Sequence, residues 1–170
     1  MSPDGTYRIT VAKEDLNFAA AHFITFAGHR CETLHGHNYR TAVLLDGKLD
    51  QESWYVVDFS AVKKIMRRLT GELDHKVLLP LENPRLQVTT KDGSVHVTYE
   101  SKPRYVFPEK DCVLLPIPNT TVEMLATLLA KKLAKELGEA GARTITALEL
   151  EVEENFGQSA TYRMIVQEDL

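Results

Sequence analysis

The sequence predicts an α+β fold, in which an antiparallel sheet carries two helices on one face. Three observations predict it. Apolar and polar residues alternate near both ends of the chain, two segments of helical periodicity lie between them, and six of the seven prolines fall between residues 80 and 118. The order is therefore β-β-α-(hairpin)-α-β-β. At 170 residues, the chain suits a single domain spanning 1–170.

Two strands are expected to open the fold. Residues 6–13 alternate between apolar and polar side chains, and the strand character continues as far as His22. Residues 35–47 are a second strand candidate that closes at an Asp-Gly turn signal. Together they predict a long hairpin connected by residues 23–34.

Two helices are expected in the middle of the chain. Asp58 or Ser60 can cap the first helix, and the second spans about 121–138, where Gly138 ends it. Their apolar stripes are Val62, Ile65, Met66, Leu69 and Leu73 in the first helix, and Val122, Leu125, Leu129, Leu133 and Leu137 in the second.

The proline-rich segment between the helices is expected to be an insertion at about 83–118. Leu86–Lys91 and Ser94–Tyr99 flank Asp92-Gly93, which predicts a β-hairpin. The remainder, 102–119, is expected to be an extended loop.

The last two strands are expected at about 144–154 and 159–167. In the first of them, apolar residues such as Val152 alternate with glutamates such as Glu153, so by parity Glu154 falls on the apolar side. A carboxylate there needs a partner, either a structural hydrogen bond or a ligand with two adjacent N–H donors. A bulge at this point would undo the parity argument.

Composition excludes several classes of protein. A net charge of −4, spread along the sequence, argues against a general nucleic-acid binder, which would show a basic stripe. The two cysteines do not make a disulfide framework, and no leader or apolar run of membrane length is present. We therefore expect a soluble cytoplasmic protein with reduced thiols and no membrane association.

Three histidines form a candidate metal site. His35 and His37 point to the same side of a strand, and His22 lies at the end of its hairpin partner. Three histidines leave one position open on a tetrahedral Zn²⁺, which is the catalytic arrangement. His-x-His pairs are also common without a metal, and Cys31 could itself be a fourth ligand that closes a structural site.

Cys31 is alternatively a proton-transfer group, because a nearby dication would favour its thiolate. Cys112 has no such neighbours and is interpreted as a packing residue. Asp74 precedes His75, and an Asp can orient an imidazole for acid–base work, although adjacent side chains often point apart.

Taken together, these residues resemble the 6-pyruvoyltetrahydropterin synthase / 6-carboxytetrahydropterin synthase family. The similarity is collinear over almost the whole chain, except residues 83–118, and only the combined pattern is specific. The residues that carry it are His22 after Phe18-Ala19-Ala20-Ala21, Cys31-x₃-His35-Gly36-His37-Asn38-Tyr39, Val57-Asp58-Phe59, Leu73-Asp74-His75, and Glu154 with Tyr162 eight residues on.

The resemblance implies the tunnelling fold, a four-stranded antiparallel sheet with two helices between strands two and three. Such subunits close into β-barrels as trimers, and the trimers stack, so a homohexamer is implied.

The resemblance also implies the roles of the site residues. Zn²⁺ would bind His22, His35 and His37. Cys31 would be the catalytic thiol, with Asp74 and His75 as its partner relay, often from a neighbouring subunit. Glu154 would grip the 2-amino and N3 edge of the pterin, and Thr121 would help to seat it.

The three-residue gap between Cys31 and His35 is closer to the carboxy-forming enzymes of deazapurine (queuosine) synthesis. The implied reaction is that of a lyase. It converts 7,8-dihydroneopterin triphosphate, a small-molecule pterin, to 6-carboxy-5,6,7,8-tetrahydropterin with loss of triphosphate and acetaldehyde. The alternatives are a pyruvoyl product, an aldolase-like step, or a non-catalytic zinc-binding protein that docks a partner through its hairpin.

The chain departs from the family pattern in two further places. Thr121 matches the first residue of a Thr-Thr or Thr-Ser pair, but Val122 takes the second place, and Asn155 follows Glu154 where Thr is common. The candidate contacts to the triphosphate are Arg30, Lys13, Lys76 and Arg163.

Overall fold

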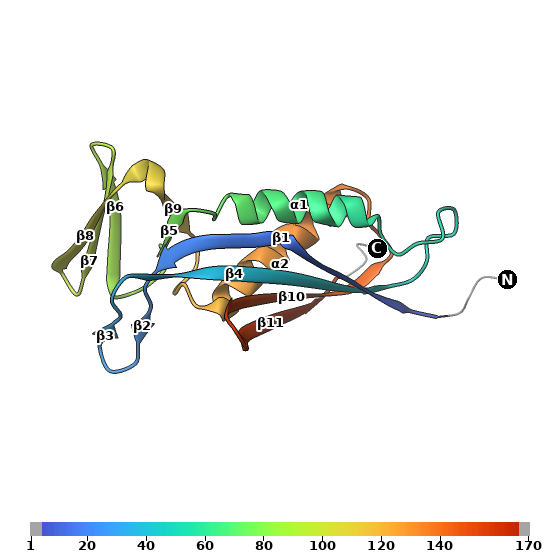
Figure 1. Ribbon diagram of the computed structural model, residues 1–170, viewed down its shortest axis with the longest axis horizontal. Helices are drawn as coiled ribbons and strands as arrows, with labels where there is room; N and C mark the ends of the chain where they lie inside the picture. Colours follow the sequence, from blue (N-terminus) through green and yellow to red (C-terminus); the bar gives the residue numbers. More distant parts are fainter. Residues whose placement is uncertain (1–4, 167–170) are drawn as a thin grey trace.

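The computed structural model describes residues 5–166, with the side chains of 13–15 left aside, and it has the predicted mixture of sheet and helices. A six-stranded sheet has the strand order β11-β10-β4-β1-β5-β9 (Figure 1). Four of these strands pair antiparallel. They are β1 (Tyr7–His22), β4 (His35–Gly47), β10 (Ile145–Asn155) and β11 (Gln158–Ile165).

Both predicted helices are present and cover one face of the sheet. α1 (Phe59–Gly71) packs on β1, α2 (Val122–Glu139) packs on β10 and β11, and the helices also contact each other. Asp58 rather than Ser60 is the N-cap of α1, because its carboxylate accepts the Ser60 N–H at 2.7 Å. No helix within residues 5–166 combines the length and apolar character that crossing a membrane requires.

The prediction of a four-stranded sheet was wrong by two strands. β5 (Lys76–Pro80) pairs parallel to β1, and β9 (Cys112–Leu115) pairs parallel to β5. Both are short apolar runs, which are typical of buried parallel strands but show no alternation from which a strand could be predicted. The sheet therefore extends beyond the hairpin toward the insertion.

The insertion contains more structure than the predicted hairpin and loop. The hairpin of β6 (Leu86–Lys91) and β7 (Ser94–Tyr99) is confirmed, but β8 (Lys102–Pro108) adds a third strand where an extended loop was expected. β8 lies at the edge of this small sheet, where prolines such as Pro103 and Pro108 are tolerated. We call β6–β8 the insertion sheet.

The apolar side chains form two separate cores. The main core lies between the large sheet and the two helices and includes Met66, Leu133 and Leu148, all completely buried. The second, which we call the insertion core, holds the insertion sheet against residues 23–34. It consists of Phe23, Leu79, Leu86, Val95 and Val97, with partly buried neighbours that include Cys31, Leu34 and Tyr105.

Gly47 at the end of β4 offers a test of packing. A Cβ at this position would lie 2.5 Å from the carbonyl oxygen of Thr144 and 2.7 Å from a methyl carbon of Val56. Because a backbone carbonyl cannot rotate away, we expect Gly47→Ala to lower the free energy of unfolding by about 1–3 kcal/mol.

The matched control is Gly71 in α1, where an added Cβ meets nothing within 4 Å. Gly71→Ala should raise that free energy by about 0.4–1 kcal/mol. Urea unfolding measures both variants, and an undiminished stability of Gly47→Ala would contradict the predicted clash.

Candidate metal centre and active site

Strand register brings the three predicted histidines together. β1 and β4 pair so that His22 lies opposite His35, and Ala20 opposite His37. The ring centroid of His22 is 4.7 Å from that of His35 and 5.3 Å from that of His37, and the last two are 4.8 Å apart. One nitrogen of each ring lies within 4.8 Å of the others. The hairpin thus delivers three imidazoles to one point.

In two of these rings, Nδ1 is held by a hydrogen bond to a backbone carbonyl, which leaves Nε2 free for the cluster. His22 is 2% exposed, and its Nδ1–H donates to the carbonyl of Thr120 at 2.8 Å. Burial lowers the pKa of His22 to about 4, so its ring is neutral. Its buried Nε2 finds no hydrogen-bond partner among the described residues. His35 likewise directs Nδ1 to the carbonyl of Thr33 at 3.0 Å. A neutral imidazole with its second nitrogen held in this way is the form that binds metals, so the three histidines are positioned to bind a metal ion.

Cys31 lies outside this cluster. Among residues 5–166, the group of possible metal-ligand atoms contains the three histidines and does not include the thiol. Cys31 ends the two-residue strand β3 (Arg30–Cys31), which pairs with β2 (Thr25–Phe26), and its Sγ lies 3.7 Å from the carbonyl of Glu32. Burial raises the pKa of the Cys31 thiol, and the nearby charge of Arg104 acts in the opposite direction.

Asp74 and His75 converge although they are adjacent. His75 has a positive φ of 57°, which turns its ring so that Nδ1 lies 2.8 Å from the Asp74 carboxylate. The other carboxylate oxygen accepts the N–H of Ala19 at 2.8 Å, which fixes the pair to β1.

The pKa of Asp74 is lowered chiefly by the hydrogen bond from Ala19 and also by His75. A carboxyl whose pKa falls on folding stabilises the native state above its ordinary pKa, and it loses that contribution as the pH drops through the lowered value. The anchor is therefore intact at neutral pH. His75 shares a shallow cavity of about 540 Å³ with His37 and Lys76.

The parity argument for Glu154 was wrong, because β10 has a bulge there. The register with β11 shifts between Glu153 and Asn155, so Glu154 is the extra residue. Glu154 nevertheless lies near the histidines. It lines a cavity of about 330 Å³ with His37, and its charge raises the pKa of buried Tyr39, an effect second to burial itself.

The second helix begins one residue later than predicted, which changes the interpretation of Thr121. Thr121 is the N-cap of α2, and the pair that precedes the helix is Thr120-Thr121. Thr120 is completely buried, so Thr121 is the more accessible hydroxyl of this pair. Thr120, which the sequence pattern did not single out, donates from Oγ1 to the carbonyl of Phe23 at 3.0 Å.

Glu32 is a second residue that the sequence pattern did not single out. Its carboxylate lies 3.7 Å from Nδ1 of His35 and accepts the N–H of Ile24 at 3.3 Å. The available signal was its position next to Cys31 and three residues before His35, where an acidic side chain can reach back to the imidazole.

The structure gives the proposed triphosphate contacts little support. Lys76 donates to the carbonyl of Lys110 at 2.5 Å, and Arg30 lies over the ring of Phe26. Arg163 pairs with Glu149, which lies opposite Leu44 and thus about 23 Å along the strand from His37. The side chain of Lys13 lies outside the described residues.

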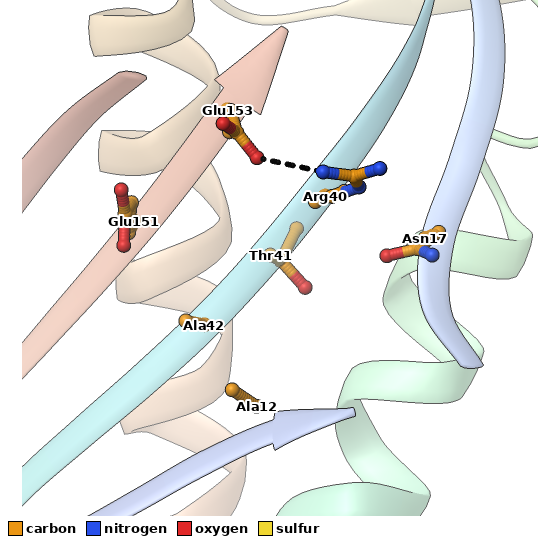
Figure 2. Close-up of a pocket in the computed structure, with 7 residues that line it drawn as sticks. All are labelled: Ala12, Asn17, Arg40, Thr41, Ala42, Glu151 and Glu153. Atoms are coloured by element: carbon orange, nitrogen blue, oxygen red, sulfur yellow. Dashed lines mark ion pairs between the residues drawn. The ribbon is translucent and has the colours of Figure 1, made fainter. Parts of the chain in front are cut away.

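Another pocket adjoins the Glu154 cavity but contains none of the histidines. Figure 2 shows this pocket of about 590 Å³ on β1, β4 and β10, with Glu151 on one side and Asn17 on the other. Arg40 and Glu153 line both pockets and form an ion pair at 3.5 Å. The two hollows therefore meet at this ion pair.

Residues 10–164 match the sequence model of the family described as 6-pyruvoyl tetrahydropterin synthase. The chain is 37% identical over 152 residues to a putative 6-carboxy-5,6,7,8-tetrahydropterin synthase from Methanocaldococcus jannaschii, covering 89% of this chain and 92% of that protein. It is 35% identical over 69 residues to a dihydroneopterin monophosphate aldolase from Pyrococcus furiosus, covering 40% of this chain and 57% of that protein.

Among solved structures, the fold is similar to 6-pyruvoyltetrahydropterin synthase from Plasmodium vivax. The TM-score is 0.87 at 32% identity, with 95% of this chain and 99% of that chain covered. That structure carries an alanine in place of a glutamate described as a catalytic residue.

Proposed function

We infer the function of this chain from the premise that it belongs to the 6-pyruvoyl tetrahydropterin synthase family. The family consists of pterin-processing enzymes, so the substrate is a small pterin. We propose that the chain is a zinc-dependent lyase that converts 7,8-dihydroneopterin triphosphate to 6-carboxy-5,6,7,8-tetrahydropterin, with loss of triphosphate and acetaldehyde. The observation that carries this proposal is the cluster of His22, His35 and His37, together with the name given to the relative from M. jannaschii.

The donor set fits Zn²⁺, because three imidazoles make a tripod that leaves one coordination position open. When bound, Zn²⁺ would polarise oxygens on the substrate. In this proposal, Cys31 and His75 move protons on the substrate. Asp74 holds the His75 imidazole in a fixed orientation, which its 2.8 Å contact supports.

The substrate would be held beside the histidines. Glu154 would accept hydrogen bonds from the 2-amino and N3 groups of the pterin, which its place in a cavity with His37 supports. Thr121, at the start of α2, would seat the ring from the side of His22. Both assignments follow the family resemblance residue by residue.

We also propose that 1–170 forms one pterin synthase-like domain and assembles as a homohexamer, a dimer of trimers. The exposure of the His75 side chain, 82%, supports this assembly, since a relay residue needs a partner surface that excludes water. A neighbouring copy that covers His75 would supply such a surface.

A second candidate function is an aldolase-like cleavage of a dihydroneopterin. Glu32 supports it, because a carboxylate 3.7 Å from His35 is a second acid–base group next to the thiol. A glutamate is described as catalytic in the P. vivax enzyme, and the P. furiosus relative is named an aldolase. One site would then offer two proton-transfer groups, Cys31 and Glu32.

Product analysis tests both candidates. We expect zinc-loaded protein incubated with dihydroneopterin triphosphate to release acetaldehyde and form the carboxy product, identified by mass. Glycolaldehyde would favour the aldolase, and a pyruvoyl product would place the chain in the other branch of the family. Zinc binding without any turnover would favour the non-catalytic alternative. Glu32→Gln separates the two activities, because only the glycolaldehyde product should depend on this carboxylate.

A further inference from the structure

The insertion sheet touches the loop that carries the thiol. We call residues 23–34 the thiol loop. Arg104 on β8 donates from Nη2 to two successive carbonyls of this loop, that of Cys31 at 3.3 Å and that of Glu32 at 2.7 Å. The hydroxyl of neighbouring Tyr105 accepts the N–H of Leu34 at 3.0 Å. One edge strand of the insertion therefore contacts the backbone of Cys31 and Glu32 and, two residues farther on, that of Leu34.

These contacts are partly sheltered from water. Arg104 is half-buried, and its guanidinium lies 5.3 Å from the ring of Tyr105. Its Nε is buried without a hydrogen-bond partner among the described residues. A charged group is costly to bury unless its hydrogen bonds recover the lost hydration, so the two carbonyls are the contacts that hold the guanidinium in place.

Within the thiol loop, Glu32 and Ile24 exchange two hydrogen bonds, but the loop has little secondary structure of its own. β2 and β3 are two residues long each, and a two-stranded hairpin is marginally stable on its own. The apolar side chains of the loop, which include Phe23 and Leu34, pack on the insertion core. The insertion therefore helps to hold the loop, together with Asn119 and Thr120, which hydrogen-bond to Thr25 and Phe23.

We propose that Arg104 is a positioning residue that fixes the Cys31–Glu32 backbone, and with it the Cys31 thiol that the proposed function uses for proton transfer. This inference rests on that proposed function. Residues 83–118 would then serve to hold the thiol loop against the histidine cluster. The positive charge of Arg104 supports the same role, because it opposes the effect of burial on the thiol pKa.

The test compares two arginines of the insertion. Arg104→Met removes the donors but keeps much of the apolar stem, whereas Arg85→Met removes an arginine that contacts the thiol loop at Phe26, away from Cys31. We expect Arg104→Met to lower kcat about 10- to 100-fold, with KM and bound zinc little changed, because small displacements of a reacting group have effects of this size.

Arg104→Lys should recover part of the loss, and Arg85→Met should leave kcat within about twofold of the parent. Equal losses in Arg104→Met and Arg85→Met, or an unchanged kcat in Arg104→Met, would overturn the proposal.

Amide hydrogen exchange gives a readout that does not require turnover. In Arg104→Met, peptides from the thiol loop should exchange faster while peptides from β10 stay unchanged. If the parent protein fails to convert the pterin, this measurement still decides whether Arg104 holds the loop. Faster exchange everywhere would indicate unfolding.

If Arg104→Met unfolds the protein, Tyr105→Phe becomes the test, because it removes only the oxygen that accepts the Leu34 N–H. It should speed exchange at Leu34 alone, and unchanged exchange there would refute the attachment of the thiol loop to β8.

Discussion

Replacing His37 by alanine is expected to abolish metal binding and turnover together. Its ring lies in the cluster with His22 and His35, and the loss leaves two imidazoles where the proposed zinc site needs three. Even the loss of a hydrogen-bond partner of a metal-bound histidine typically lowers affinity about 10- to 100-fold, so losing a ligand should exceed about 100-fold. Metal content after dialysis and kcat/KM measure the two effects.

His37 is the best of the three histidines for this test. Removing His22 would also leave the carbonyl of Thr120 unpaired in the interior, which costs about 1–3 kcal/mol of stability and mixes folding with metal binding. His96→Ala on β7 is the matched control, because this histidine belongs to the insertion sheet and lies outside the cluster. Full zinc occupancy in His37→Ala would show that the cluster is not the metal site.

Replacing Cys31 by alanine is expected to separate metal binding from chemistry. Zinc content should stay at the parent level, because the thiol lies outside the group of ligand atoms. Turnover should fall about 10²- to 10⁴-fold, which is the usual contribution of a positioned acid–base group. Zinc analysis and a rate measurement on the same sample give both numbers.

Cys112→Ala is the control for the loss of a thiol from the insertion core, where both cysteines are partly buried. It should keep zinc and turnover. If Cys31→Ala loses zinc instead, Cys31 is a metal ligand, and the closed structural site with no chemistry becomes the better interpretation.

The arrangement of the histidines could be predicted from the sequence because it depends on two strong local regularities. Side chains two residues apart on a strand share a face, and a hairpin brings the end of one strand beside the start of the next. His35 and His37 satisfy the first rule, and His22 satisfies the second. Both helices were predictable for a similar reason, since their apolar stripes repeat over several turns.

Where the prediction failed, the deciding contact was distant in sequence or the strand was irregular. The bulge at Glu154 broke the alternation on which its orientation was inferred. β5 and β9 are apolar runs that form strands only because β1 and β5 offer a pairing edge. Arg104 reaches Cys31 across 73 residues of sequence, and no local pattern indicates such a contact.

The hydrogen bond between His22 and Thr120 has a consequence for a chain during its synthesis. The two residues are 98 positions apart. A nascent hairpin that has emerged from the ribosome can already hold all three imidazoles, yet the carbonyl that fixes the tautomer of His22 has not been translated. If the cluster binds a metal ion as proposed, we expect such a chain to bind it weakly and reversibly, and to bind it tightly only once Thr120 is in place.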